Sequence, residues 1–460
     1  MLVGTTVFLY TWTLTTHGKY SVSGDEPHYL IIAESLRSDG DLDLANNYAE
    51  DDGRLFGHTG LKNDAHAVPS RRGDLRSIHP LGLPVLVLPV YVAAQILADV
   101  PSAATLRRFR MDRGLFAYSI VSLSLAAMTA FAVALLAGGL ATVTKSRYAA
   151  AIAVTAGISP PVVSHAFLVF PEIVAFTVTC LVVWFSLKRP GVRDGHILAG
   201  LMLIVGMLPW FHVKYFVYAP ALLAFLFVGR WSDIRVMARR RRGTMALLFV
   251  APQLILVAWA WYEWGTLGGA LTTEGVPLSW AAVVDGAGGL LFDRQSGLLV
   301  YAPIYWIVPA CWWLTRRHTW AFAVPVATLY LPAAAFVMWW AGFAPAARYL
   351  VPAVPFLAVS VARAFEARAV RVAAAVVAAL QIPVNAMTWQ RPRTLWPANE
   401  SNPALEALGV PGRAYAEFLP AMRLDGMDAS VAPALFAAAG VTILLIVGAT
   451  WRHRERSQTP

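Results

Sequence analysis

Several stretches of this chain are apolar over lengths that match the thickness of a lipid bilayer. Residues 114–142, 245–262 and 431–451 are three examples, and a helix needs about 20 such residues to cross the hydrocarbon core. The composition agrees, because 58% of the 460 residues are hydrophobic and only 14% are charged. A chain with so little polar surface cannot cover a soluble globule, and it is equally unlike a disordered, collagen-like or disulfide-stapled chain. We predict an all-α polytopic membrane protein.

The basic residues are concentrated between the apolar runs. The chain has 37 Lys and Arg against 27 Asp and Glu, a net charge of +10. Most of the basic residues fall in seven short segments: 99–113, 144–147, 188–196, 230–243, 316–318, 363–371 and 451–460. Such an excess in short connections marks the cytoplasmic side of a membrane protein. We therefore place these segments, including the cluster 239–242 and the tail 451–460, in the cytoplasm, and we expect no nucleic-acid partner.

Polarity and negative charge predict the external loops. An apolar segment at 1–16 lacks the basic start and the cleavage site of a signal peptide, and a long loop of net negative charge follows it at 17–80. Further external loops are predicted at 263–296 and 389–430. No repeat and no separate soluble domain is visible, so residues 1–450 are predicted to form a single transmembrane domain.

The predicted spans are of two kinds. Full spans are expected near 81–98, 244–262, 297–315, 319–338, 349–362, 372–388 and 431–450. The runs 148–187 and 196–228 break near the middle, at 159–172 and 209–214, into pairs of short helices. Non-helical backbone is tolerated at membrane depth only where it is buried in protein or lines a cavity. The run 114–143 has basic residues at both ends, so either it turns back on itself or one loop is misassigned, and the total is 11 to 13 spans.

Two charged residues lie in apolar surroundings at these breaks. Glu172 follows a run that ends Phe-Pro, and Lys214 lies between two aromatic pairs. A charge at membrane depth costs at least about 2.5–3.5 kcal/mol, which makes it a functional candidate. The alternative is that each break reaches the headgroup layer, or that the lysine snorkels to it.

The densest group of polar residues is Ser-Gly-Asp-Glu-Pro-His-Tyr at 23–29. The adjacent carboxylates of Asp25 and Glu26 could deprotonate a hydroxyl or hold a divalent cation. The same residues are also typical of the start of a helix, since proline is favoured in a first helical turn and acidic residues stabilise it. Asp41 and Asp43 could add ligands, although their setting is that of an ordinary turn.

Three histidines of the first loop are predicted to be solvated loop residues. His58, His66 and His79 lack the spacing of metal ligands on a helix, which argues against a zinc set.

The order of these motifs resembles the GT-C class of integral-membrane glycosyltransferases, which includes the protein O-mannosyltransferases and the lipid A aminoarabinose transferase. The resemblance rests on Gly-Asp-Glu-Pro-His-Tyr at 24–29, His-Pro-Leu-Gly at 79–82, Phe-Pro-Glu at 170–172, Lys-Tyr at 214–215, and Trp-Trp-Ala-Gly-Phe with Ala-Arg-Tyr-Leu-Val-Pro at 339–352. It covers roughly residues 1–390 and is specific only in the first loop.

The resemblance implies a reaction and a set of residues. It implies transfer of a sugar from a polyprenyl-phosphate donor to a glycan, lipid or protein acceptor, on the external face of the plasma (inner) membrane. The expected catalytic residues are Asp25, Glu26 and Glu172, and the same three would hold Mg²⁺ or Mn²⁺ if the enzyme uses a metal. The expected substrate-binding residues are His28, Tyr29, His79, His212, Lys214, Tyr215, Arg348 and Tyr349.

The chemistry of these residue types fits that reaction. Inverting transfer needs a base on the acceptor hydroxyl and positive charge on the leaving phosphate. Asp25 and Glu26 supply the first, and Lys214 and Arg348 the second, with Arg348 expected to point its guanidinium toward the external surface. Two other interpretations stay open. Broken helices with charged vertices are also typical of a transporter or lipid-linked-sugar flippase, and a non-catalytic scaffold could keep the same fold.

Overall fold

The computed structural model describes residues 22, 24–188, 195–238, 242–266, 278–280, 282–391, 394, 396, 402–411, 419 and 421–422. Several sequence-based predictions lie outside these residues. They are the apolar segment 1–16, most of the basic cluster 239–242, residues 267–277 and 281 of the loop 263–296, much of the loop 389–430, the last span at 431–450 and the tail 451–460.

The described part of the chain is mostly helical and divides into two compact units, which we describe separately. The first unit contains α2 (Glu26–Ser38), α3 (Ala45–Ala49), η1 (Asp52–Phe56), β1 (Ala67–Pro69), β2 (Leu75–Ser77), α4 (Gly82–Leu97), α5 (Ala103–Arg108), α10 (Gly195–Gly206), η3 (Leu208–Trp210), α11 (Tyr215–Ala238) and α12 (Arg242–Trp264).

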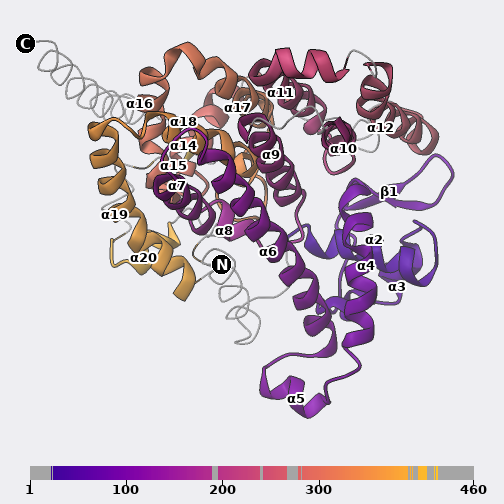
Figure 1. Ribbon diagram of the computed structural model, residues 1–460. Coiled ribbons are helices and arrows are strands. Elements are labelled where there is room, and N and C mark those ends of the chain that lie inside the picture. Colours follow the sequence, from indigo (N-terminus) through magenta and orange to yellow (C-terminus); the bar gives the residue numbers. More distant parts are fainter. Residues whose placement is uncertain are drawn as a thin grey trace, which may run out of the picture. The chain divides into compact units, whose positions relative to one another are not determined.

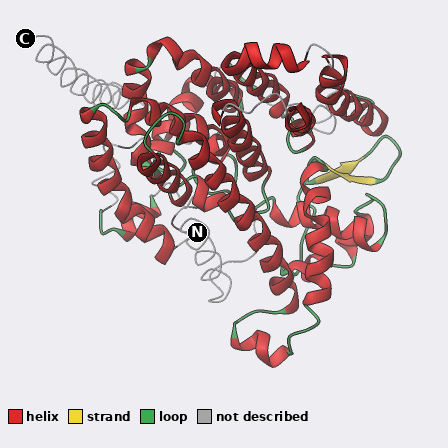
Figure 2. Cartoon of the chain, viewed as in Figure 1, coloured by secondary structure: helices red, strands yellow, loops and turns green. Residues whose placement is uncertain are grey.

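The second unit contains α7 (Ser146–Ile158), α8 (Val162–His165), α14 (Ala282–Phe292), α15 (Leu298–Tyr301), η4 (Pro303–Ile307), α16 (Val308–Leu314), α17 (Arg316–Ala335), η5 (Arg348–Ala353), α18 (Val354–Ala364), α19 (Arg368–Gln390) and α20 (Pro403–Ala407). The division of the chain falls within α6 (Arg113–Leu140) and α9 (Pro171–Lys188). Figure 2 shows helices throughout the described residues, with β1 and β2 as the one strand pair.

Four helices are long and apolar enough to cross a membrane: α6, α9, residues Gly243–Trp264 of α12, and α19. Five shorter helical segments are also apolar: Gly82–Leu97, Gly195–Trp210, Tyr215–Val228, Ala282–Phe292 and Trp320–Ala335. The all-α class is therefore confirmed for the described residues, apart from two short strands. Four full-length helices in this part of the chain are fewer than the 11 to 13 spans that we predicted.

The surfaces of α12 and α19 are apolar where they face away from the protein. Only 17% of the most apolar window of each helix is buried. Large aliphatic side chains on them are more than half exposed: Leu247, Leu254, Ile255, Val372, Val376, Leu380 and Ile382. Long rows of exposed aliphatic side chains are costly in water. These helices therefore suggest association with a membrane.

Both predicted helix breaks are present, and two predicted spans are wrong. Only the four-residue α8 lies between the end of α7 at Ile158 and the start of α9 at Pro171, and α10 gives way through η3 to α11. The run 114–143 is one continuous helix, α6. In contrast, the predicted span 297–315 is split into α15, η4 and α16, because the prolines at 303 and 309 interrupt the helix. The predicted span 349–362 consists of the short η5 followed by the 11-residue α18.

The first loop is folded rather than extended. Its helix α2 begins at Glu26 with Pro27 in the first turn, as predicted, and packs against α4 (Figure 1). Glu34 of α2 is buried and is held by the Arg37 guanidinium, at 2.8 Å, and by the Tyr91 hydroxyl of α4, at 2.9 Å. The hydrogen bond to Tyr91 joins α2 to α4.

Candidate functional site

Two histidines that are 13 residues apart in sequence meet at one end of the β1–β2 hairpin. Ala67 pairs with Ser77 in the antiparallel strands, so His66 precedes one strand at the end where His79 follows the other. Nδ1 of His66 and Nε2 of His79 are 2.9 Å apart. The Ser77 hydroxyl holds both residues, since it donates to the His66 carbonyl (3.3 Å) and accepts from the His79 N–H (3.0 Å).

Asp25 lies beside this histidine pair, at the residue that precedes α2. One carboxylate oxygen of Asp25 and one ring nitrogen each of His66 and His79 lie within 4.8 Å of one another. Within the described residues, this is the group of His, Cys, Asp or Glu side chains that is compact enough to hold a metal ion. The structure thus groups Asp25 with His66 and His79 rather than with Glu26 and Glu172, and the three histidines that we expected to be solvated are half-buried.

His28 packs against this group from α2. Its ring stacks on that of His66, with centroids 3.6 Å apart and 10° between the planes. Its Nδ1 is 2.8 Å from the Tyr48 hydroxyl. Burial lowers the pKa of His28 to about 2 and also lowers the pKa of His66. Both imidazoles are therefore neutral near pH 7, which is the form of imidazole that binds a metal.

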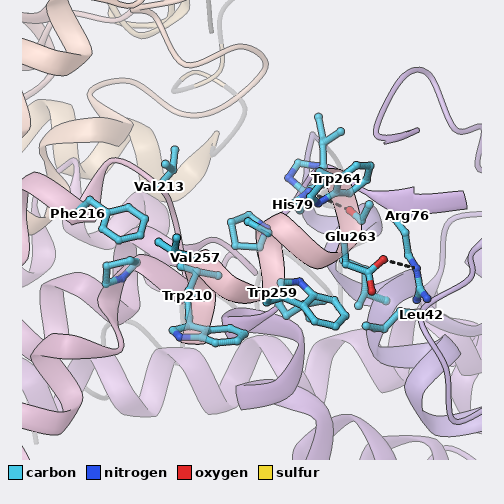
Figure 3. Close-up of a pocket in the computed structure, with 18 residues that line it drawn as sticks. Leu42, Arg76, His79, Trp210, Val213, Phe216, Val257, Trp259, Glu263 and Trp264 are labelled. Carbon is cyan, nitrogen blue, oxygen red and sulfur yellow. Dashed lines mark hydrogen bonds and ion pairs between the residues drawn. The ribbon is translucent and has the colours of Figure 1, made fainter. Parts of the chain in front are cut away.

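A pocket lies next to His79 in the same unit (Figure 3). Its wall combines indole rings with charged and polar side chains: Trp210, Trp259, Trp264, Arg76, Glu263 and His79. Nε of Arg76 is 3.4 Å from Oε2 of Glu263, and a second guanidinium nitrogen is 3.0 Å from a carboxylate oxygen of Asp74. A pocket with apolar faces and a few placed polar groups is the usual form of a small-molecule site.

The backbones of two pocket elements approach closely at Gly82. A Cβ atom at this position would lie 2.6 Å from the carbonyl oxygen of Trp210. The indole of Trp210 is fixed in turn, because its Nε1 donates to the Pro252 carbonyl of α12 at 2.8 Å. Glycine at the start of α4 therefore sets where η3 and the Trp210 ring lie.

Glu172 and Lys214, the two charges in apolar surroundings, pair with each other. Nζ of Lys214 is 2.6 Å from Oε1 of Glu172, whose side chain is fully buried, while that of Lys214 is 13% exposed. Nζ also lies 5.3 Å from the centre of the Tyr215 ring, and Nδ1 of His212 accepts from the Lys214 N–H at 3.3 Å. Each charge thus has a compensating partner at the helix breaks, as an ion in low-dielectric surroundings requires.

Glu26 and two of the predicted substrate-binding tyrosines are buried. Oε1 of Glu26 accepts hydrogen bonds from the Tyr118 hydroxyl (2.8 Å) and from the Val169 N–H (2.9 Å). Glu26 therefore anchors the start of α2 rather than facing the pocket. Tyr29 and Tyr215 are also buried, although the ring of Tyr29 packs on that of His79, with centroids 4.7 Å apart.

The two residues predicted from the Ala-Arg-Tyr motif belong to the second unit. Arg348 starts η5 and is only 5% exposed, so its side chain is buried in the protein. Tyr349 is half-buried, and its ring lies edge-on to that of Phe336, with centroids 6.4 Å apart. The second unit has a pocket of its own, lined by residues that include Tyr305, Trp306, Trp312 and Tyr330.

Sequence reasoning missed three residues of the site: His66, Arg76 and Glu263. A predicted β-hairpin would have indicated His66 and Arg76. Residues 70–74 contain a turn, with Gly73 at a φ of +94°, between the two short strands. Glu263 follows directly on an apolar run and was assigned to an external loop. Its carbonyl accepts from the Arg71 N–H of the hairpin at 2.9 Å, and its side chain is buried.

Comparisons of the chain with protein-family models, with curated proteins and with solved structures found no match.

Proposed function

We propose that this chain is a membrane-embedded glycosyltransferase that moves a sugar from a polyprenyl-phosphate donor to an acceptor hydroxyl. One observation carries the proposal: the pocket wall of the first unit contains three indole rings, the charged side chains of Arg76 and Glu263, and His79, which also belongs to the Asp25–His66–His79 group. A sugar has C–H faces that pack on aromatic rings and hydroxyls that need charged or polar partners. This wall offers both.

The proposed reaction is an inverting displacement at the anomeric carbon. The acceptor oxygen forms a bond to that carbon, the bond from carbon to the phosphate oxygen breaks, and polyprenyl phosphate leaves with the electron pair. The proton of the acceptor hydroxyl passes to a base, and Asp25 is assigned this step. The acceptor is a glycan, a lipid or a protein.

Positive charge on the leaving phosphate lowers the barrier to this step. Arg76 lies in the pocket wall, and Lys214 follows Val213, which also lines the pocket. Both cations are paired with carboxylates, Lys214 with Glu172 and Arg76 with Asp74 and Glu263, but of the two only Arg76 lines the pocket. We therefore assign the larger share to Arg76 and leave Arg348, a residue of the second unit, out of this site.

The proposed location follows from the charge pattern and from the apolar helices. The basic connections lie in the cytoplasm, so the first loop and its pocket face the outside of the plasma membrane, where assembly of cell-envelope glycans, glycolipids or glycoproteins takes place. The C-terminus is assigned to the cytoplasmic side. Labelling of an introduced Glu50→Cys by an impermeant thiol reagent in intact cells tests this sidedness, and a shielded residue 50 would contradict it.

Transfer by the purified protein tests the activity. The full chain in nanodiscs is incubated with a panel of radiolabelled polyprenyl-phosphate monosaccharides and with glycan, lipid and peptide acceptors. We expect label to move to one acceptor class, with release of polyprenyl phosphate, and Trp259→Ala to reduce this transfer. If Trp259→Ala hydrolyses the donor or transfers the sugar at the wild-type rate, the reaction takes place in another site.

A second candidate is a transporter or lipid-linked-sugar flippase. The observation that favours it is the pair of broken helices, α7–α8–α9 and α10–η3–α11, with Glu172 and Lys214 paired beside the breaks. The same preparation distinguishes the two functions. A flippase moves the labelled donor across a vesicle bilayer and leaves the sugar attached to its phosphate.

A further inference from the structure

We propose that Asp25, His66 and His79 form a binding site for a divalent transition-metal ion, and that zinc is the ion that fits it best. This inference concerns metal binding alone, so it holds or fails independently of the transferase reaction.

The ligand types select the metal. Two imidazole nitrogens and one carboxylate oxygen are a common protein ligand set for zinc. Mg²⁺ and Ca²⁺ instead take sites made of oxygen ligands, and Mn²⁺ binds nitrogen ligands more weakly than zinc does. The Mg²⁺ or Mn²⁺ expected from the sequence therefore fits the residues of this group less well than zinc.

The distances are close to those that a zinc ion would impose. A zinc ion holds imidazole nitrogens at about 2.0–2.1 Å in a tetrahedral arrangement, which places two such nitrogens about 3.3 Å apart. Nδ1 of His66 and Nε2 of His79 are 2.9 Å apart, and the Asp25 oxygen lies within 4.8 Å of both.

The surrounding residues hold both imidazoles in place. Ser77 ties the backbones of His66 and His79 together at the end of the hairpin. The stacked ring of His28 covers one face of His66, and Tyr29 packs on His79. Fixed orientation of the ligands by such neighbours is typical of metal sites, in which their loss costs about 10- to 100-fold in affinity.

Three protein ligands leave one tetrahedral position for a further ligand. Structural zinc sites usually have four protein ligands, whereas catalytic sites have three and hold water or substrate at the fourth position. His79 belongs both to this group and to the wall of the pocket. A metal ion held by this group would thus lie beside the pocket, and its fourth position would take a water molecule, a hydroxyl or a phosphate oxygen.

Metal content and stability test the site directly. The full chain, purified in detergent with an affinity tag that contains no histidine, is treated with a chelator and dialysed against Zn²⁺ with excess Mg²⁺. We expect one zinc per chain by elemental analysis, a rise in melting temperature on zinc addition, and a tetrahedral visible spectrum when Co²⁺ replaces zinc. His66→Ala and His79→Ala should each lose the bound zinc and the thermal shift.

The exposed His196 of α10 supplies a matched control. His196→Ala removes one imidazole elsewhere in the first unit and should keep one zinc per chain. A wild-type chain that holds no zinc after reloading, or His66→Ala and His79→Ala variants that keep it, would overturn the proposal and leave the 2.9 Å contact as a hydrogen bond between the two rings. If a histidine variant fails to fold, the Co²⁺ spectrum of the wild-type chain is the test: a tetrahedral spectrum supports the site, and its absence contradicts it.

Discussion

The two compact units each contain a pocket with indole rings, but the two pockets differ in charge. The pocket of the first unit has Arg76, Glu263 and His79 in its wall. None of the described residues that line the pocket of the second unit is charged. There the two indole N–H groups are bound to the protein, since Nε1 of Trp306 donates to the Leu299 carbonyl at 3.0 Å and Nε1 of Trp312 donates to Ser360 Oγ at 2.8 Å.

This difference shows where chemistry can take place. Aromatic side chains alone give an apolar surface that suits core packing or a hydrocarbon chain equally well. Proton transfer and charge stabilisation need titratable or charged groups in fixed positions. In the described residues, such groups meet around the hairpin of the first unit, so substitutions there should affect activity, whereas substitutions in the second pocket should affect stability.

The largest effect is expected at Asp25. Asp25→Asn keeps the shape of the side chain but removes its basicity and weakens its hold on a cation. Transfer should fall by roughly 10²–10⁴-fold, the usual contribution of a general base, while expression stays normal. Initial rates of sugar transfer measure the effect. Glu50→Gln, which changes an exposed acid of the same segment, should stay at the wild-type rate. An Asp25→Asn variant that transfers sugar as fast as the wild type would remove Asp25 from the mechanism.

The Glu172–Lys214 pair gives the next largest effect, and it acts on folding. Glu172→Gln or Lys214→Met alone leaves a charge buried without its counterion, which should lower the free energy of unfolding by about 3–5 kcal/mol. The double variant should regain most of this loss. Denaturation in detergent of the wild type, the two single variants and the double variant gives the unfolding free energies for a double-mutant cycle.

The exposed pair Arg113–Asp99 supplies the comparison for this cycle, because both of its side chains are more than 60% exposed. Asp99→Asn should cost less than about 1 kcal/mol. A cycle at Glu172 and Lys214 with no coupling energy would show that the two charges are stabilised by other groups.

The sequence predicted the local structure of the site better than its three-dimensional contacts. The start of α2 at Glu26 and the breaks before Pro171 and at 209–214 followed from proline and charge patterns. The His66–His79 contact could not follow from helical spacing, because a β-hairpin brings the two residues together. Likewise, two charges 42 residues apart, Glu172 and Lys214, were each recognised as costly, but nothing in a single sequence indicates that one compensates the other.

A third prediction concerns the shape of the first pocket. Gly82→Ala would place a methyl group 2.6 Å from the Trp210 carbonyl, so η3 and α4 must move apart. We expect a loss of about 1–3 kcal/mol in unfolding free energy, as for overpacked cores, together with weaker substrate binding as the Trp210 ring shifts. Gly200→Ala, at a helix position with open space around it, is the matched control and should not be destabilised. A Gly82→Ala protein of wild-type stability would show that the two backbones can separate freely.

The smallest effect is expected in the pocket of the second unit. Trp312→Phe removes the indole N–H that donates to Ser360 Oγ, while that hydroxyl keeps its bond to the Phe356 carbonyl at 2.8 Å. Loss of one neutral hydrogen bond costs about 1 kcal/mol, which thermal denaturation can detect. Because no described charged residue lines this pocket, the transfer rate per folded molecule should stay close to that of the wild type. A large loss of transfer in Trp312→Phe, at nearly normal stability, would show that the second pocket takes part in the reaction and that the absence of charge there reflects an apolar part of the substrate.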